Sequence, residues 1–176
     1  MIETDVFIAG AGLAGSIAAL SYSKAGRNVI IADPFTHSDN TKLDYRTTAY
    51  LQPSKLFLET LGVWEAIEDF AMPLEVMKII DSSGTQEGDK IKSQKEFKSA
   101  EVSDLPFGWN VKNSLMRKAL KHLIDCQINC ELMNGTSAVD FVSRDSVAYV
   151  KLSSGNTVKA KLVIADKVRF PIIREK

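Results

Sequence analysis

The hexapeptide GAGLAG at residues 10–15 constrains the fold more than any other feature, because it follows directly on the apolar, β-favouring run DVFIA. In a G-x-G-x-x-G pattern, Gly10 makes the tight turn out of a strand, and Gly12 lets the backbone approach a pyrophosphate. Gly15 lets the following helix pack close to that strand. The sequence therefore predicts a strand, a tight turn and a helix whose N-terminus faces phosphate groups.

The residues after this motif complete a β-α-β unit. SIAALSYSKA has apolar residues at helical spacing, and Gly26 follows where a helix end favours positive φ. Asn28 to Ala32 is typical of a second buried strand, and Asp33 at its tip is placed to accept from a ribose hydroxyl. An acid there disfavours a ribose 2′-phosphate, so NADP is a poor candidate while FAD and NAD remain. A glycine turn without a ligand is the alternative interpretation.

The middle of the chain predicts helices and then strands. Residues 54–61 have a helical pattern that stops at Gly62 and resumes over 63–70. A strand is expected to begin at Leu74, and the polar residues that follow it are weakly patterned. We therefore expect an inserted layer of β-structure after the two short helices.

The last third predicts one helix and a β-meander. Residues 114–124 are amphipathic, and Asn113 stands where a helix cap is expected. The predicted apolar face consists of Leu115, Ala119, Leu120 and Leu123. The strands that follow end in LVIA, which is apolar enough to be buried on both faces of a sheet. The order of elements favours an open α/β sheet with an antiparallel addition.

Composition excludes several classes of function. Lys plus Arg equals Asp plus Glu, 22 against 22, so no basic surface for nucleic acid is expected. Cys126 and Cys130 are too few to bind a metal, and we expect buried thiols instead. The chain shows neither a signal peptide nor an apolar run long enough for a membrane span, which indicates a cytoplasmic protein.

The segment from Asp44 onward, DYRTTAYLQPSKLFLETLGVWEAIEDFAMPLEVMKIIDSSG, strongly resembles the ubiquinone-biosynthesis hydroxylases, a branch of the FAD-dependent aromatic-ring monooxygenases. Asp44, Arg46 and Ala49 match the Asp-x-Arg-x-x-Ala stretch of that family. The sequence LGVW and the later Pro73 also match the family pattern. FGWNVKNSLMRKAL resembles the family's Gly-Tyr-x-Val-x-Asn segment, with Trp109 in the Tyr position. The likeness covers nearly the whole chain.

The resemblance implies a Rossmann-like FAD-binding sheet with an inserted antiparallel β layer. In this plan the whole chain, 1–176, is the N-terminal portion of an FAD-binding monooxygenase domain. Residues 1–72 form the ADP-binding unit and its helices, 73–107 form part of the substrate-side β layer, and 108–176 return to the FAD sheet. Relative to the family, this fold is incomplete.

The resemblance also implies an activity: hydroxylation of a polyprenyl phenol, with FAD as cofactor and NAD(P)H and O2 as co-substrates. It implies a ubiquinone-biosynthesis protein complex as partner, and a peripheral position at the inner membrane as the alternative to a purely cytoplasmic one. By this analogy the ADP moiety is held by Gly10, Gly12, Ala14, Gly15 and Asp33.

Further residues are carried over from the family with less support from the sequence. Arg46 is expected along the ribityl or flavin side of FAD, and Asn113 and Arg117 are expected at the same cofactor. No catalytic residue is assigned. His37 and His122 occupy no position that the family uses, and His122 is expected on a helix surface.

The sequence departs from the family near its end. Family members are about twice as long, and they carry an Asp-Gly pair after the LVIA strand and a Gly-Asp pair further downstream. Lys167 and Val168 stand where the first pair belongs, and the second pair is absent. We therefore expect a truncated or degenerate homologue that binds FAD weakly at best. A non-catalytic nucleotide- or partner-binding module is the alternative. An NAD-dependent dehydrogenase is a third hypothesis, which accounts for GAGLAG but not for DYRTTAY or LGVW.

Overall fold

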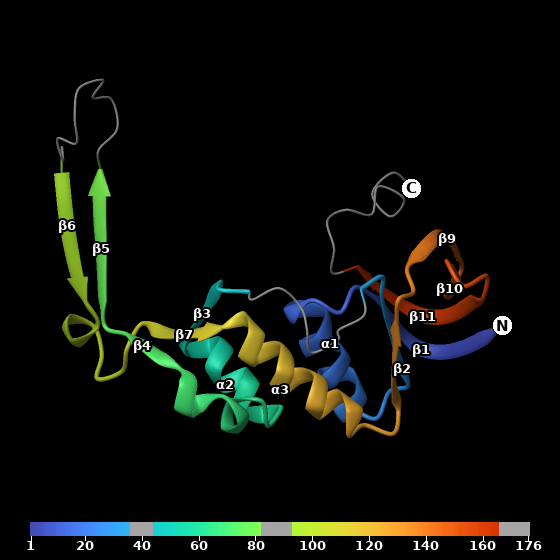
Figure 1. Ribbon diagram of the computed structural model, residues 1–176, viewed down its shortest axis with the longest axis horizontal. Helices are drawn as coiled ribbons and strands as arrows, with labels where there is room; N and C mark the ends of the chain where they lie inside the picture. Colours follow the sequence, from blue (N-terminus) through green and yellow to red (C-terminus); the bar gives the residue numbers. More distant parts are fainter. Residues whose placement is uncertain (36–43, 82–92, 166–176) are drawn as a thin grey trace. The chain divides into compact units, whose positions relative to one another are not determined.

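The structure is a computed structural model that describes residues 1–35, 44–81 and 93–165. The chain divides into two compact units, and each is described by itself. Unit 1 combines Met1–Tyr45 with Asn113–Lys176, and unit 2 is Arg46–Lys112 (Figure 1). Unit 1 is therefore built from two stretches of chain that are distant in the sequence.

The described part of unit 1 holds a six-stranded sheet with the strand order β8-β2-β1-β11-β10-β9. Its strands are β1 (Ile2–Ala9), β2 (Val29–Asp33), β8 (Cys130–Asn134), β9 (Ala138–Arg144), β10 (Val147–Leu152) and β11 (Thr157–Ala165). The first four in the sheet order pair in parallel, while β10 pairs antiparallel with both β11 and β9. The α/β class with an antiparallel addition is thus confirmed.

Two helices of unit 1, α1 (Leu13–Lys24) and α3 (Asn113–Asp125), pack against each other, as Figure 1 shows. The first ends as predicted at Gly26, whose φ of 76° allows its N–H to reach Ser23 O at 2.9 Å. The N–H of Arg27 reaches Tyr22 O at 3.0 Å, which completes a Schellman motif.

The predicted apolar face of α3 is right for Leu120 and wrong for its other three residues. The buried stripe contains Met116, Leu120 and Ile124, whereas Leu115, Ala119 and Leu123 are only half-buried. Met116, Leu120 and Ile124 follow one another at intervals of four, so they form a single row on the helix surface. The predicted residues Leu115, Ala119 and Leu123 flank that row, because apolar residues on both sides of a stripe satisfy the same periodicity.

The core on one face of the sheet lies between the parallel strands and the antiparallel addition. Phe7, Ile30 and Val158 from the parallel strands cluster there with Val150 and Leu152 from β10 of the addition. All five are 4% exposed or less. The antiparallel strands therefore contribute to the core beside the β-α-β unit.

The prediction that LVIA is buried on both faces is wrong. Leu162 is 41% exposed, and Val163 and Ile164 are half-buried. Strand β10 pairs with β11 only from Thr157 to Ala160, so beyond that point the described residues pair β11 with β1 alone. One edge of the LVIA segment is thus left without a strand partner in the described part of the chain.

Unit 2 begins with a strand and a helix, β3 (Thr47–Leu51) and α2 (Gln52–Thr60). The predicted stop at Gly62 is confirmed, since its φ is 65° and its N–H donates to Glu59 O at 2.9 Å. The predicted helix over 63–70 is wrong. Two short 3₁₀ turns, Trp64–Ala66 and Glu68–Phe70, replace it, because buried Ile67 between them takes a non-helical φ of −131°.

The rest of the described part of unit 2 is mainly β-structure, as predicted. The described part contains a three-stranded sheet, β3-β7-β4, and a two-stranded one, β5-β6. These further strands are β4 (Met72–Leu74), β5 (Val76–Asp81), β6 (Ser93–Lys98) and β7 (Gly108–Lys112), with a 3₁₀ turn at Ser99–Glu101. All pairings within both sheets are antiparallel.

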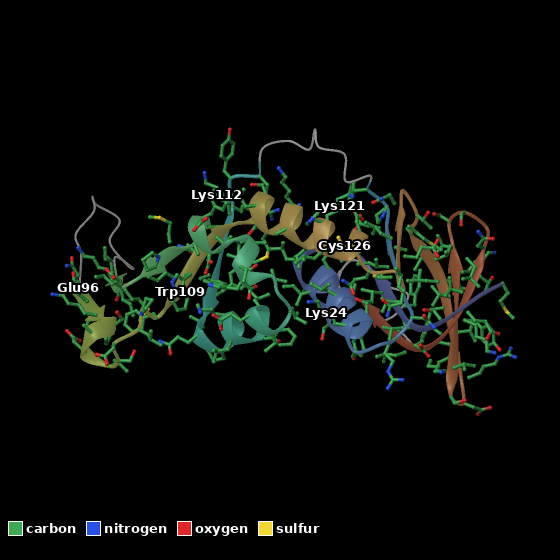
Figure 2. All side chains as sticks on the ribbon, turned by 90° about the horizontal axis from the view of Figure 1, so that it is seen from below. Lys24, Glu96, Trp109, Lys112, Lys121 and Cys126 are labelled. Atoms are coloured by element: carbon green, nitrogen blue, oxygen red, sulfur yellow. The ribbon has the colours of Figure 1, made fainter. Side chains whose placement is uncertain are left out.

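An aromatic pair anchors the centre of unit 2. The rings of Trp64 and Trp109, the latter labelled in Figure 2, meet edge to face with centroids 5.5 Å apart. Lys55 lies over both rings, at 5.1 and 5.5 Å from the centroids, and its ammonium is paired with Glu59. Trp109, which occupies the family's Tyr position, thus connects β7 to the first 3₁₀ turn.

Candidate nucleotide-binding site

The glycine loop joins β1 to α1 with the geometry that the sequence predicts. Gly10 has a φ of 111°, a backbone conformation that L side chains rarely adopt, and its N–H donates to Ala32 O of β2 at 2.8 Å. Gly12 precedes the helix in an extended conformation, and its carbonyl accepts the N–H of Ser16 at 2.9 Å. The loop therefore turns sharply out of the sheet and starts the helix within the motif itself.

The N-terminus of α1 is suited to an anion. The first N–H groups of an α-helix have no partner within the helix, and in the described residues no side chain caps this one. No acidic side chain lies in its first turn. Gly12 is half-buried, Ala14 is exposed, and Gly15, in the first turn of the helix, is buried. Neither a capping side chain nor an acid of the first turn therefore neutralises the positive end of the helix dipole.

Asp33 lies at the same loop, where its carboxylate accepts backbone N–H groups. Its side chain is only 1% exposed, and Oδ2 accepts the N–H of Ala11 at 2.7 Å. Its Oδ1 accepts the N–H of Phe35 at 2.9 Å. The carboxylate thus contacts the glycine loop directly. Its contact with a ribose hydroxyl stays a prediction.

Two more predicted site residues belong to α3. Asn113, expected as its cap, is the first residue of the helix and is 8% exposed. Arg117 pairs through Nη2 with Oδ2 of Asp44 at 3.1 Å. Its Nε is buried and has no hydrogen-bond partner in the described part of the structure. The described residues thus satisfy the guanidinium of Arg117 at Nη2 but not at Nε.

Arg46 belongs to unit 2, where it is exposed and directly precedes β3. The structure therefore gathers the glycine-loop residues and Asp33 at one place, and it joins Arg117 to the Asp44 of the Asp-x-Arg stretch. The predicted positions His37, Lys167 and Val168 lie outside the described residues.

Several residues that support the loop were not predicted. Asn129 donates through Nδ2 to Ser23 O and Arg27 O, both at 2.8 Å, and so ties the start of β8 to the end of α1. Ser16 Oγ donates to Ala11 O at 3.3 Å across the loop. The position of Ser16, a small polar residue directly after GAGLAG, could have indicated its role in the loop. Asn129 gave none, because its partners are more than 100 positions away.

The remaining chemistry-bearing side chains lie away from the loop. His122 is exposed on α3, as predicted. The expectation of two buried thiols is wrong for Cys126, which lies exposed after the end of α3 near Lys121 (Figure 2). Burial raises the pKa of the half-buried Cys130 thiol to about 11. The described residues contain no cluster of ligands for a metal ion, and no helix among them has the length and apolar character of a membrane span.

Comparisons with known proteins place the chain in a family. The family described as FAD binding domain matches residues 3–166. Ubiquinone hydroxylase UbiM of Neisseria meningitidis is 26% identical over 96% of this chain and 37% of the relative. The 3-demethoxyubiquinol 3-hydroxylase of Escherichia coli is 25% identical over 92% of this chain and 40% of the relative.

Solved structures extend the comparison to the fold. The p-nitrophenol 4-monooxygenase PnpA of Pseudomonas putida superimposes with a TM-score of 0.78 at 18% identity, over all of this chain and 44% of that one. The chain spans about two fifths of the length of the curated relatives, 37% and 40%.

Proposed function

This chain belongs to the FAD binding domain family, and we propose from that premise that its glycine loop binds the ADP half of FAD. The observation that carries the proposal is the junction of β1 and α1. Gly10 turns at a φ of 111°, and the helix that follows has neither a capping side chain nor an acid in its first turn. An anionic pyrophosphate is the ligand that such a helix N-terminus favours. Gly10, Gly12, Ala14 and Gly15 would hold it.

Three further residues would hold other parts of the cofactor. Arg117 supports this role through its buried Nε, which has no partner among the described residues. Asn113, four residues earlier on α3, and Arg46, which precedes β3, are proposed from the family pattern. When bound, FAD supplies the chemistry of accepting electrons from NAD(P)H and activating O2. The residues of this chain bind and orient it.

We propose that the protein to which this chain contributes is a monooxygenase that hydroxylates a polyprenyl phenol in ubiquinone biosynthesis. The names of the curated relatives, a ubiquinone hydroxylase and a demethoxyubiquinol hydroxylase, support this proposal. Residues 1–72 would form the ADP-binding part, 73–107 part of the substrate-side layer, and 108–176 the return to the FAD sheet. A position in a biosynthetic complex at the inner membrane belongs to the same proposal.

Nucleotide binding can be tested on the chain as it stands. Isothermal titration with ADP should give saturable binding, and Gly10→Ala should weaken it by at least about tenfold, because a side chain is strained at a φ of 111°. The matched control is Gly155→Ala. Gly155 has a φ of 87° and open space around it, in a hairpin turn of the same unit. Equal ADP affinity in wild type and Gly10→Ala would refute the assignment of the loop.

The monooxygenase proposal needs a second experiment. The chain is co-expressed with the part of the Escherichia coli relative that lies beyond the matched region, and co-purified flavin and NAD(P)H-dependent hydroxylation are measured. Both should appear, and both should be lost with Gly10→Ala. ADP binding without flavin retention or hydroxylation in the co-expressed pair would contradict the enzyme and favour a nucleotide-binding module.

A further inference from the structure

We infer that Asn134 is a site of spontaneous deamidation, and that the reaction places a second carboxylate beside Asp33 at the carboxyl ends of the parallel strands. Asn134 is the one asparagine of the sequence that a glycine follows. The modification itself is independent of the proposed nucleotide binding, whereas its effect on a ligand rests on that proposal. The two parts are tested by separate measurements.

The Asn134–Gly135 peptide is exposed to water. Asn134 is an exposed residue at the end of β8, and in the described sheet β8 is an edge strand that pairs with β2 alone. Gly135 is also exposed, has a φ of 69°, and leaves open space where a side chain would stand. The hydrogen bond to Asp33 O just beyond the strand comes from Thr136 N, at 3.0 Å. No β-carbon therefore hinders an approach to the nitrogen of Gly135.

Deamidation at this peptide needs water as its one co-reactant. The nitrogen of Gly135 loses its proton and attacks Cγ of Asn134. The new N–C bond forms as the C–N bond of the side-chain amide breaks, and ammonia leaves with the proton. Water then adds to one carbonyl of the cyclic imide and opens the ring to aspartate or isoaspartate. No electron is transferred, and a neutral carboxamide has become a carboxylate.

The sheet register places the new carboxylate beside Asp33. Asn134 pairs with Asp33 across the parallel strands β8 and β2, so the two side chains lie on the same face of the sheet. Ala32 and Met133, one residue earlier on each strand, contribute to the core on the opposite face. Neighbouring strands are about 4.8 Å apart, so the two carboxylates repel at short range.

The effect on an anionic ligand follows from the order of the strands. The glycine loop leaves β1, and β2 alone separates β1 from β8. The new charge therefore lies roughly 10 Å from the loop, which is two strand spacings. Repulsion of a diphosphate over that distance in water weakens its binding by about two- to tenfold, and salt reduces this effect because the Debye length is about 8 Å at physiological ionic strength.

Peptide mapping of the aged chain tests the modification. The purified protein is incubated at mildly alkaline pH, and aspartate and isoaspartate are quantified at each asparagine by mass spectrometry and enzymatic isoaspartate methylation. The products should accumulate at position 134 at least about tenfold faster than at Asn156, which is also exposed but precedes the β-branched Thr157. Equal rates at the two positions would overturn the inference, and so would the absence of product at position 134.

A second measurement tests the placement of the charge. ADP is titrated calorimetrically into Asn134→Asp and into Asn134→Gln, which keeps a neutral amide. Asn134→Asp should bind ADP about two- to tenfold more weakly at low salt, and the two affinities should converge as salt is added. Equal affinities at low salt would overturn the placement. If Asn134→Asp does not fold, aged wild type takes its place, with equally aged Asn134→Gln as its control.

The outcomes separate this inference from the proposed function. If fresh wild type binds no ADP, the proposed function is refuted, while product at position 134 in the peptide map still supports the modification site. If fresh wild type binds ADP and the map shows no product at position 134, the inference is refuted alone.

Discussion

Substituting Gly108 by alanine should destabilise unit 2 because the backbone of a neighbouring strand occupies the space that a β-carbon needs. A β-carbon built at Gly108 would lie 2.5 Å from Tyr50 O and 3.0 Å from Leu51 Cα. The first distance is far shorter than ordinary van der Waals contact, and the obstacle is backbone rather than a movable side chain. Gly108 pairs with Leu51 at the end of the β3–β7 ladder, so relief requires these strands to separate there.

The size of the effect follows from what separation loses. Opening the end of the ladder removes one or two backbone hydrogen bonds, each worth about 0.5–1.5 kcal/mol. Overpacking in a fitted site typically lowers the free energy of unfolding by about 1–3 kcal/mol. Both estimates agree on a loss of about 1–3 kcal/mol for Gly108→Ala.

The assay uses the two tryptophans of the chain, both of which lie in unit 2. Urea unfolding followed by tryptophan fluorescence therefore reports on this unit, and the midpoint should fall in Gly108→Ala with an unchanged slope. The control is Thr47→Ala, an exposed position at the other end of β3, which should change the free energy by less than about 0.5 kcal/mol. A loss below about 0.5 kcal/mol in Gly108→Ala would refute the steric argument.

Three further predictions concern unit 1. Leu120→Ala should lower the free energy of unfolding by about 2–5 kcal/mol, because the side chain is 0% exposed. An unchanged midpoint in thermal unfolding would contradict that packing. Asn129→Ala should lower the free energy of unfolding by about 1–3 kcal/mol, because two hydrogen bonds are lost. Amide exchange at the end of α1 should become faster, and unchanged exchange there would contradict the role of these hydrogen bonds. Burial raises the pKa of Cys130 to about 11, so only about 1% of its thiol is thiolate at pH 9. Iodoacetamide should therefore label the exposed Cys126 first and Cys130 far more slowly, as followed by mass spectrometry. Equal labelling of the two cysteines would contradict the burial of Cys130.

The parts of the fold that the sequence predicts well are those fixed by local chemistry. Gly10, Gly26 and Gly62 each adopt the positive φ that their places in the pattern require. The β-α-β unit follows from them, because turns and helix ends confine the elements between them. The loop residues and Asp33 come together within this one unit, while their contact with a nucleotide stays a prediction.

The errors occur where long-range packing decides. Which stripe of α3 is buried depends on α1, and the exposure of Leu162 depends on how far β10 extends along β11. The bonds of Asp33 to Ala11 and Phe35 could not be predicted either, because an acid at a strand end is compatible with a ligand and with a backbone partner. Periodicity identifies an apolar residue without identifying its neighbour.

The pairing of β1 with β11 has a consequence for the synthesis of the protein. Ile2 aligns with Val158, so the central strand of the sheet must wait for a partner made more than 150 residues later. At the usual pace of translation, about 5–20 residues per second, this delay is roughly 10 to 30 seconds. During that time Phe7 and Ile8, both fully buried in the finished sheet, lack one neighbouring strand on the ribosome. The nascent chain should therefore be a chaperone client until β11 has emerged.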